Sequence, residues 1–232
     1  MLTHRFSKLG LLGVLILLMS CTDASGPALD LAEQGVLGTP LGVRRDLNVL
    51  RVPESADLCA AAVSRCSGGS DPGPVTASMW VVRGSSAKLT IYYEDLFGGR
   101  DDNSDGHPLL EFEVPPEGLA YYPGGTQFES GDSVLITVSL GGSEYNATFE
   151  PSGLIFSDLQ PAELRFWYGQ QGLDLNGDGI VDGEDQRIQQ ALGVWYQESG
   201  RDEWASVSQV HDSAGHRFSA SVFHFSNYAV GW

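Results

Sequence analysis

Basic residues are scarce in this chain. Its 232 residues include 13 Lys and Arg against 30 Asp and Glu, which gives a formal net charge of −17 at pH 7. Binding to nucleic acid requires a basic surface that neutralises phosphates, so the sequence predicts no nucleic-acid partner. The same balance disfavours electrostatic binding to anionic lipid headgroups. Apolar residues make up 42% of the chain, which is enough for a packed core and argues against intrinsic disorder.

Long hydrophobic runs are also missing. The apolar run near the N-terminus, Leu9–Met19, holds eleven residues and follows the basic Arg5 and Lys8. A membrane-spanning helix needs about 20 residues, so this run is typical of the apolar region of an export signal. The run leads into Leu18-Met19-Ser20-Cys21, which resembles the end of a bacterial lipoprotein signal.

The resemblance implies that residues 1–20 are removed and that Cys21 becomes the lipid-modified first residue. The lipid would then attach the protein to a membrane. Thr22 follows the cysteine, where an Asp would resemble an inner-membrane retention signal, so we expect the outer membrane of a bacterial cell envelope. The alternative is an ordinary export signal with an incidental cysteine.

Cysteine is rare, and only Cys59 and Cys66 remain besides Cys21. An exported protein meets oxidising surroundings, so a disulfide between these two residues is expected. Seven residues on a straight helix rise about 10 Å, which is too far for a disulfide, so the bond requires a bend between the two cysteines. A metal site is the weaker alternative, because no His lies nearby in the sequence.

Common hydrolase signatures are missing as well. The sequence contains neither Gly-x-Ser-x-Gly nor His-Glu-x-x-His. The paired carboxylates of a glycosidase cannot be chosen among 30 acids without geometry. His211 and His216 flank a four-residue turn and could hold a metal, although residues that flank a hairpin turn meet in any case. An extracytoplasmic hydrolase acting on glycan or peptide therefore stays open as an alternative function.

What the chain does have is many turns between short alternating runs. It holds 29 Gly and 11 Pro, which argues against a helical bundle. The runs predict a mainly β fold, an antiparallel β-sandwich with one short helix. That helix is expected at Glu184–Leu192, with Gly193 as its C-cap. Strands are expected at Val43–Val52, Met79–Arg83, Lys88–Tyr93, Leu109–Val114, Val134–Leu140, Tyr145–Phe149, Leu164–Tyr168, Val207–His211 and Phe218–Phe225.

Residues 174–185 have the ligand spacing of an EF-hand calcium loop. Gly179 stands at position 6, where the chain turns sharply, and Val181 at position 8 is expected to face the core. Asp at position 12 replaces Glu, which resembles dockerin-type calcium loops. The alternative is a solvated acidic turn without metal. The predicted Ca2+ ligands are the side chains of Asp174, Asn176, Asp178, Asp182 and Asp185 and the backbone carbonyl of Ile180.

A partial copy of this spacing lies earlier in the chain. Asp101, Asn103 and Asp105 repeat its first half, but Pro108 and Phe112 then stand at positions 8 and 12. An acidic hairpin turn is the favoured interpretation, and a weaker second metal site is the alternative.

Three stretches resemble the ZU-type β-sandwich domain, which netrin receptors, ankyrins and FIIND proteins share. They are Val114–Leu119, Phe149–Tyr168 and His224–Val230, within a region that covers about residues 76–232. The calcium loop and its helix depart from the family pattern, as does the start of the region before Leu109. The resemblance implies a binding or scaffolding module rather than an enzyme.

In FIIND-type relatives, a His-Phe-Ser motif marks the bond at which the chain cuts itself, which implies possible cleavage between Phe225 and Ser226. His224 could accept the proton of the serine hydroxyl. In a strand, His224 and Ser226 would lie on the same face. The favoured alternative is structural, with Phe225 in the core and Ser226 bonded to the backbone.

The sequence thus predicts three parts, which are a lipoprotein signal peptide at 1–20, a tether and N-terminal segment at 21–75, and a sandwich at 76–232. The expected protein is a lipid-anchored, calcium-stabilised module of the cell envelope. It would bind a protein or glycan partner.

Overall fold

A computed structural model describes residues 42–52, 72–97, 106–169, 172–198 and 203–232. All the described residues lie in one compact unit of the chain, residues 37–232. No helix in these described ranges is both long and apolar enough to cross a membrane.

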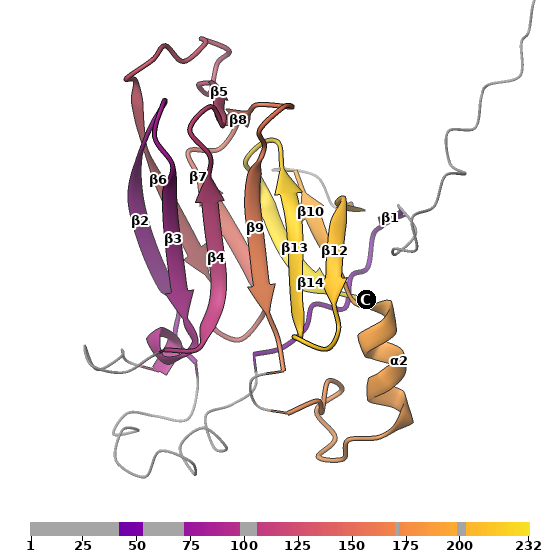
Figure 1. The fold of residues 1–232 in the computed structure, drawn as a ribbon. Coiled ribbons are helices and arrows are strands. Elements are labelled where there is room, and N and C mark those ends of the chain that lie inside the picture. The colour runs from indigo at the N-terminus through magenta and orange to yellow at the C-terminus, as the bar shows by residue number, and fades with distance from the viewer. Residues whose placement is uncertain (1–41, 53–71, 98–105, 170–171, 199–202) are drawn as a thin grey trace, which may run out of the picture. The chain divides into compact units, whose positions relative to one another are not determined.

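Two antiparallel sheets form the two layers of a sandwich, as the sequence predicts (Figure 1). A two-stranded ribbon of β5 (Leu119–Tyr121) and β8 (Ile155–Phe156) lies at one end of the sandwich. The seven-stranded sheet has the order β1 (Val43–Arg44), β11 (Trp204–Ser206), β10 (Gly193–Gln197), β14 (Asn227–Gly231), β7 (Asn146–Glu150), β6 (Ser133–Leu140) and β2 (Val75–Val82). The five-stranded sheet has the order β12 (Gln209–Asp212), β13 (Arg217–Val222), β9 (Ala162–Trp167), β4 (Pro108–Val114) and β3 (Ala87–Tyr92).

The core lies between the two sheets, where alternate residues of each strand point inward. In β4, Leu110, Phe112 and Val114 are fully buried, while Glu111 and Glu113 between them reach the outer surface. Phe112 contacts Phe149 of β7 with a ring-centroid separation of 5.1 Å, so aromatic packing joins the two sheets.

The segment before residue 76 contributes to the sandwich. β1 pairs with β11, and Val49 forms a single bridge with Gly231. Leu50 and Val52 are buried in the common core. The compact sandwich unit therefore begins well before residue 76, although the expected strand Val43–Val52 is reduced to two residues and isolated bridges.

Several predicted boundaries are wrong. The strand expected over Phe218–Phe225 ends at Val222, and the helix α2 spans Gly183–Ala191 with Leu192 as its C-cap residue. Gly193 does not cap the helix because it is the first residue of β10. The sequence interpretation also missed β5, β8, β10, β11, β14 and the 3-10 helix η1 (Tyr93–Phe97).

Candidate functional site: an acidic loop before helix α2

The first half of the acidic loop folds around the carboxylate of Asp174. Its Oδ1 accepts hydrogen bonds from the backbone N–H groups of Gly177 and Asp178 at 2.8 and 3.1 Å, and its Oδ2 accepts from Gly179 at 2.8 Å. Gly177 and Gly179 both have positive φ angles, 77° and 87°, which are strained for other residues. The glycines therefore let the chain curl tightly round the first predicted ligand.

The second half closes on Asp185. Its Oδ1 accepts from the backbone N–H groups of Leu175 at 2.7 Å and Asn176 at 3.2 Å, and its Oδ2 accepts from Asp182 at 2.8 Å. The side chain is buried, with 2% exposure. The backbone N–H of Asp182, followed by those of Leu175 and Asn176, lowers the pKa of Asp185 against the opposing effect of burial. This side chain thus ties both ends of the loop together in its ionised form.

Asp182 ends the loop and starts helix α2. Its Oδ1 accepts from the backbone N–H of Glu184 at 2.7 Å, and Asp182 and Asp185 form a reciprocal capping box. Two carboxylates in the first turn, Glu184 and Asp185, also suit the positive end of the helix dipole. The helix therefore begins at Gly183, one residue before its predicted start.

The donor set of the loop suits a hard cation. The predicted ligands are carboxylate, amide and carbonyl oxygens, the kind that Ca2+ prefers. Asn176 Oδ1 and Asp178 Oδ1 each accept one backbone N–H, at 2.9 and 2.8 Å, and a carboxylate or amide oxygen has a second lone pair to offer. Within the described ranges, none of the five acids of the loop forms an ion pair, so their mutual repulsion is unrelieved by a basic side chain.

The side chains of the predicted Ca2+ ligands do not point toward one common position in the loop. In the part of the chain that the structure describes, no group of three or more His, Cys, Asp or Glu side chains has the spacing of a metal site. The carboxylates of Asp174 and Asp185 are instead bonded to backbone N–H groups of the loop. The arrangement fits the chemistry of calcium binding, while closure around an ion would require the side chains to move inward.

One prediction about the loop is wrong. Val181 at position 8 is 61% exposed, and its neighbour Ile180 is 63% exposed. In the structure, the inward anchor of this region is Ile188 of α2, which joins the core. Because the loop extends away from the sandwich, its apolar pair meets no core surface.

Helix α2 joins the loop to the five-stranded sheet through polar contacts. Gln189 Nε2 donates to the hydroxyl of Tyr168 and to the carbonyl of Ser213, both at 3.3 Å. The Tyr168 hydroxyl lies 2.5 Å from His211 Nε2, and the ring of His216 also packs against Tyr168. Sequence analysis placed the two histidines together but did not identify Tyr168 or Gln189, because neither lies near them in sequence.

The His-Phe-Ser motif lies in the connection between β13 and β14 rather than in a strand. Phe225 is buried, and its ring contacts Phe112, Phe149 and Phe156 with centroid separations of 5.1 to 5.6 Å. The Ser226 hydroxyl donates to the carbonyl of Gln197 at 2.6 Å. These are the contacts that the structural alternative predicts.

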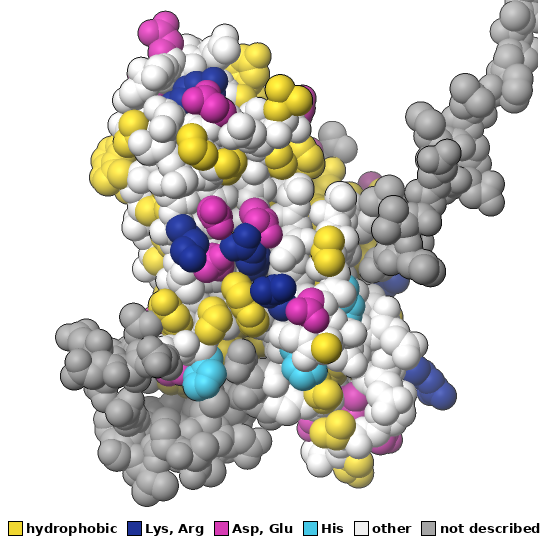
Figure 2. Space-filling model, viewed as in Figure 1, with side chains coloured by type: hydrophobic (Ala, Val, Ile, Leu, Met, Phe, Trp, Pro, Cys, Tyr) yellow, Lys and Arg dark blue, Asp and Glu magenta, His cyan; other side chains and the backbone are white. Residues whose placement is uncertain are grey.

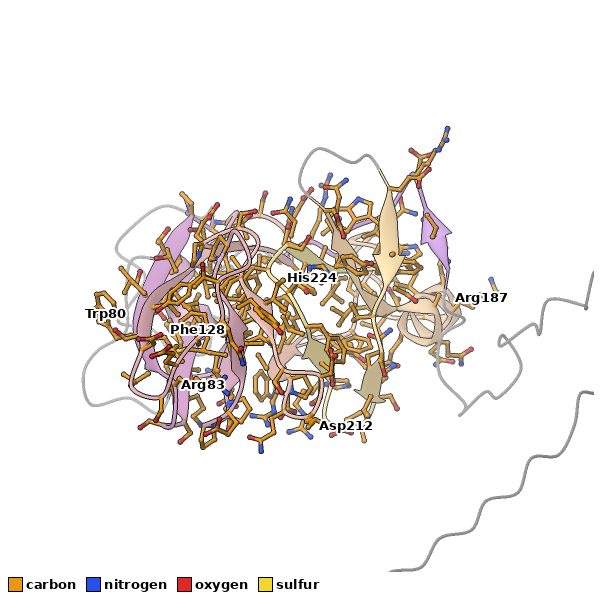
Figure 3. The ribbon with its side chains drawn as sticks, turned by 90° about the horizontal axis from the view of Figure 1, so that it is seen from above. Trp80, Arg83, Phe128, Arg187, Asp212 and His224 are labelled. Atoms are coloured by element: carbon orange, nitrogen blue, oxygen red, sulfur yellow. The ribbon has the colours of Figure 1, made fainter. Side chains whose placement is uncertain are left out.

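His224 takes part in a different contact. The Tyr228 hydroxyl donates to the backbone carbonyl of His224 at 2.7 Å, and the ring of His224 packs edge-on against Tyr196. Figure 3 labels His224 among the side chains of the sandwich. The motif therefore fixes the turn into the last strand.

Several predicted sites fall outside the described residues. They are Cys21, the pair Cys59 and Cys66, and the partial acidic loop at Asp101, Asn103 and Asp105. Lipidation, the disulfide and the second metal site stay predictions from sequence.

A shallow hollow of about 250 Å3 lies on the five-stranded sheet and is lined by Ser86, Ala87, Lys88 and Glu113. Among the described residues, Glu113 is the one carboxylate in its lining, whereas glycoside cleavage needs two on opposite sides of the bond. Comparisons with protein-family models, with curated proteins and with solved structures found no match to this chain.

Proposed function

We propose that the protein is a lipid-anchored, calcium-stabilised binding module of a bacterial cell envelope. The observation that carries the calcium part is the closure of the 174–185 loop on Asp174 and Asp185, with the acids unpaired within the described residues. The lipoprotein-like signal supports the anchor. The ZU-like stretches support a binding role and stay a prediction from sequence.

The proposed calcium ion stabilises the fold rather than acting as a sensor. Calcium would bind the folded loop and not the unfolded chain, so it adds stability by mass action. At ten times the Kd, this amounts to about 1.4 kcal/mol. Because α2 bonds Tyr168 through Gln189, a firmer loop would also hold the helix on the sheet.

The calcium proposal is tested by the melting temperature of the chelated full-length protein before and after addition of CaCl2. We expect calcium to raise the melting temperature of the wild type and to leave Asp178→Ala unchanged. Asp158→Ala, which removes an exposed acid outside the loop, is the matched control and should respond like the wild type. The proposal fails if calcium raises none of the three, or raises all three equally.

The anchor is tested by fractionation of cells that express the chain with Cys21→Ser. We expect this variant to leave the membrane fraction for the soluble periplasmic or secreted fraction. Cys59→Ser removes a different cysteine and should stay with the membrane. An unchanged distribution of Cys21→Ser would contradict lipidation at that residue.

A further inference from the structure

The outer face of strands β2 and β6 combines a large exposed aromatic ring with rows of hydroxyl groups. The register places Trp80 opposite Leu135, and the two side chains are 65% and 42% exposed. Val82 beside them is 38% exposed. Figure 3 shows the Trp80 side chain projecting outward at the margin of the sandwich. Apolar surface of this kind on a folded protein commonly marks a site of contact with a partner.

Neutral polar side chains extend from this apolar group along the two strands. Thr76 lies opposite Ser139 with their hydroxyl oxygens 3.0 Å apart, and Ser78 lies opposite Thr137 at 2.9 Å. Each hydroxyl can donate one hydrogen bond and accept two, so these pairs keep capacity for further bonds.

A second row begins at the Thr76–Ser139 pair and crosses the sheet, perpendicular to the strands. Ser139 lies opposite Thr148 of β7, Thr148 opposite Asn227 of β14, and Asn227 opposite Gln197 of β10. Directly opposed residues share a face, so five strands place five neutral hydrogen-bonding side chains in one line. With strands about 4.8 Å apart, the line spans roughly 19 Å.

Charge is nearly missing from this surface. Its one ionised side chain over β2, β6 and β7 is Glu150, opposite Thr137, and Glu150 Oε2 accepts the backbone N–H of Ser152 at 2.6 Å. The whole chain has a net charge of −17, so a face this neutral stands apart from the rest of the molecule. A charged ligand would gain little from it, whereas an uncharged ligand rich in hydroxyl groups would match it.

We propose that this face binds a neutral, extended glycan. The C–H side of one sugar ring packs on the indole of Trp80, because polarised C–H groups suit the negative face of an aromatic ring. Sugar hydroxyls then exchange hydrogen bonds with Thr76, Ser139 and Thr148 along the row. The inference rests on the proposed role as a binding module and gives that role a class of ligand.

The test uses a printed array of neutral and acidic polysaccharides, probed with the full-length protein purified in detergent. We expect retention on at least one neutral polysaccharide and none on the acidic ones. Trp80→Ala should reduce that retention about tenfold or more, while Trp80→Tyr should keep most of it because a ring remains. Val210→Ala removes an exposed apolar side chain from the other sheet and is the matched control, with no expected effect.

Three results would overturn the inference, namely no neutral polysaccharide retained, retention only on acidic polysaccharides, or equal retention by the wild type and Trp80→Ala. A circular-dichroism melt of each variant separates loss of binding from loss of fold. If calcium stabilisation and membrane anchoring are found while the array stays empty, the glycan inference alone fails and the proposed function stands.

Discussion

The two sheets share a core but differ in what they present to solvent. On the five-stranded sheet, Arg165 forms ion pairs with Glu111, Glu113 and Glu163, and Lys88 forms one with Glu111 at 3.1 Å. These charges gather in the middle of the face in Figure 2. On the seven-stranded sheet, the outer surface over β2, β6 and β7 combines hydroxyl groups with exposed apolar side chains, Trp80 among them, and a single carboxylate, Glu150.

The charged side chains of the five-stranded sheet are already paired with one another, whereas the side chains around Trp80 are available to a ligand. Burial alone would lower the pKa of Arg165, yet its hydrogen bonds to Glu163, Glu111 and Glu113 raise the pKa above its ordinary value. The guanidinium is therefore committed to its neighbours. Trp80, in contrast, leaves most of its surface to solvent. For this reason we propose that a partner binds to the outer face of β2 and β6 rather than to the five-stranded sheet.

The largest loss of stability is expected from a substitution in the core between the two sheets. Phe112→Ala removes a fully buried ring that contacts Phe149 on the opposite sheet, and should lower the free energy of unfolding by about 3–5 kcal/mol. Urea titration measures it. Leu135→Ala, on the exposed neutral face, should change the same quantity by about 0.5 kcal/mol or less. Equal losses in the two variants would contradict the placement of the core.

The next largest loss of stability is expected from the ion pairs of Arg165 on the five-stranded sheet. Arg165→Met leaves three partly buried glutamates without their common partner and should cost about 1–3 kcal/mol at neutral pH. Lys88→Met is the control, and because the Lys88 side chain is 56% exposed the substitution should cost below about 1 kcal/mol. A loss of stability in Arg165→Met no larger than the loss in Lys88→Met would argue against repulsion among the glutamates.

The stability of the protein should depend on pH through His211 of the five-stranded sheet. Burial lowers the pKa of His211, with an opposing effect from Asp212 and a further lowering by His216. Tyr168 and, through it, Gln189 face the same ring. A lowered pKa in the fold means that stability is full above the ordinary value of about 6.5 and is lost as pH falls through the folded pKa.

His211→Gln should therefore flatten the fall in melting temperature between pH 7 and pH 5, because the amide does not gain a proton there. Melting curves at three pH values measure the slope. A variant with the same slope as the wild type would show that His211 does not couple to folding.

The smallest effect on stability is expected at Trp80. Because this side chain is 65% exposed, Trp80→Ala should change the free energy of unfolding by about 0.5 kcal/mol or less. Chemical unfolding measures it alongside the core variant. A loss above about 2 kcal/mol would instead make Trp80 a structural residue and remove the contrast between the two faces.

The strands that sequence analysis placed well are those that bury one face. β4 and β6 alternate apolar and polar residues, and that period predicts them directly. β10 and β14 begin or continue as runs of buried residues, so alternation does not mark them. β5 and β8 hold three and two residues, which is too short for any period.

Helix α2 was predicted to within one residue at each end, because the apolar spacing of Ile188, Ala191 and Leu192 is a local signal. The hydrogen bonds of Asp174 and Asp185 to the loop backbone were not predicted, because the sequence analysis assigned these side chains to a metal ion. The exposure of Val181 was not predictable, because it depends on where the sandwich lies. The Trp80 face was hidden for the same reason, since a strand's outward side is fixed only by the register with its partners.

The most direct test of the central claim, that the protein binds through its neutral face, uses native material. Immobilised wild type, Trp80→Ala and Lys88→Ala are exposed to envelope extract, and the neutral sugars retained are released by hydrolysis and quantified by chromatography. We expect enrichment of neutral sugar on the wild type and on Lys88→Ala, and about tenfold less on Trp80→Ala. Equal recovery from all three proteins, or no enrichment on the wild type, would contradict the account.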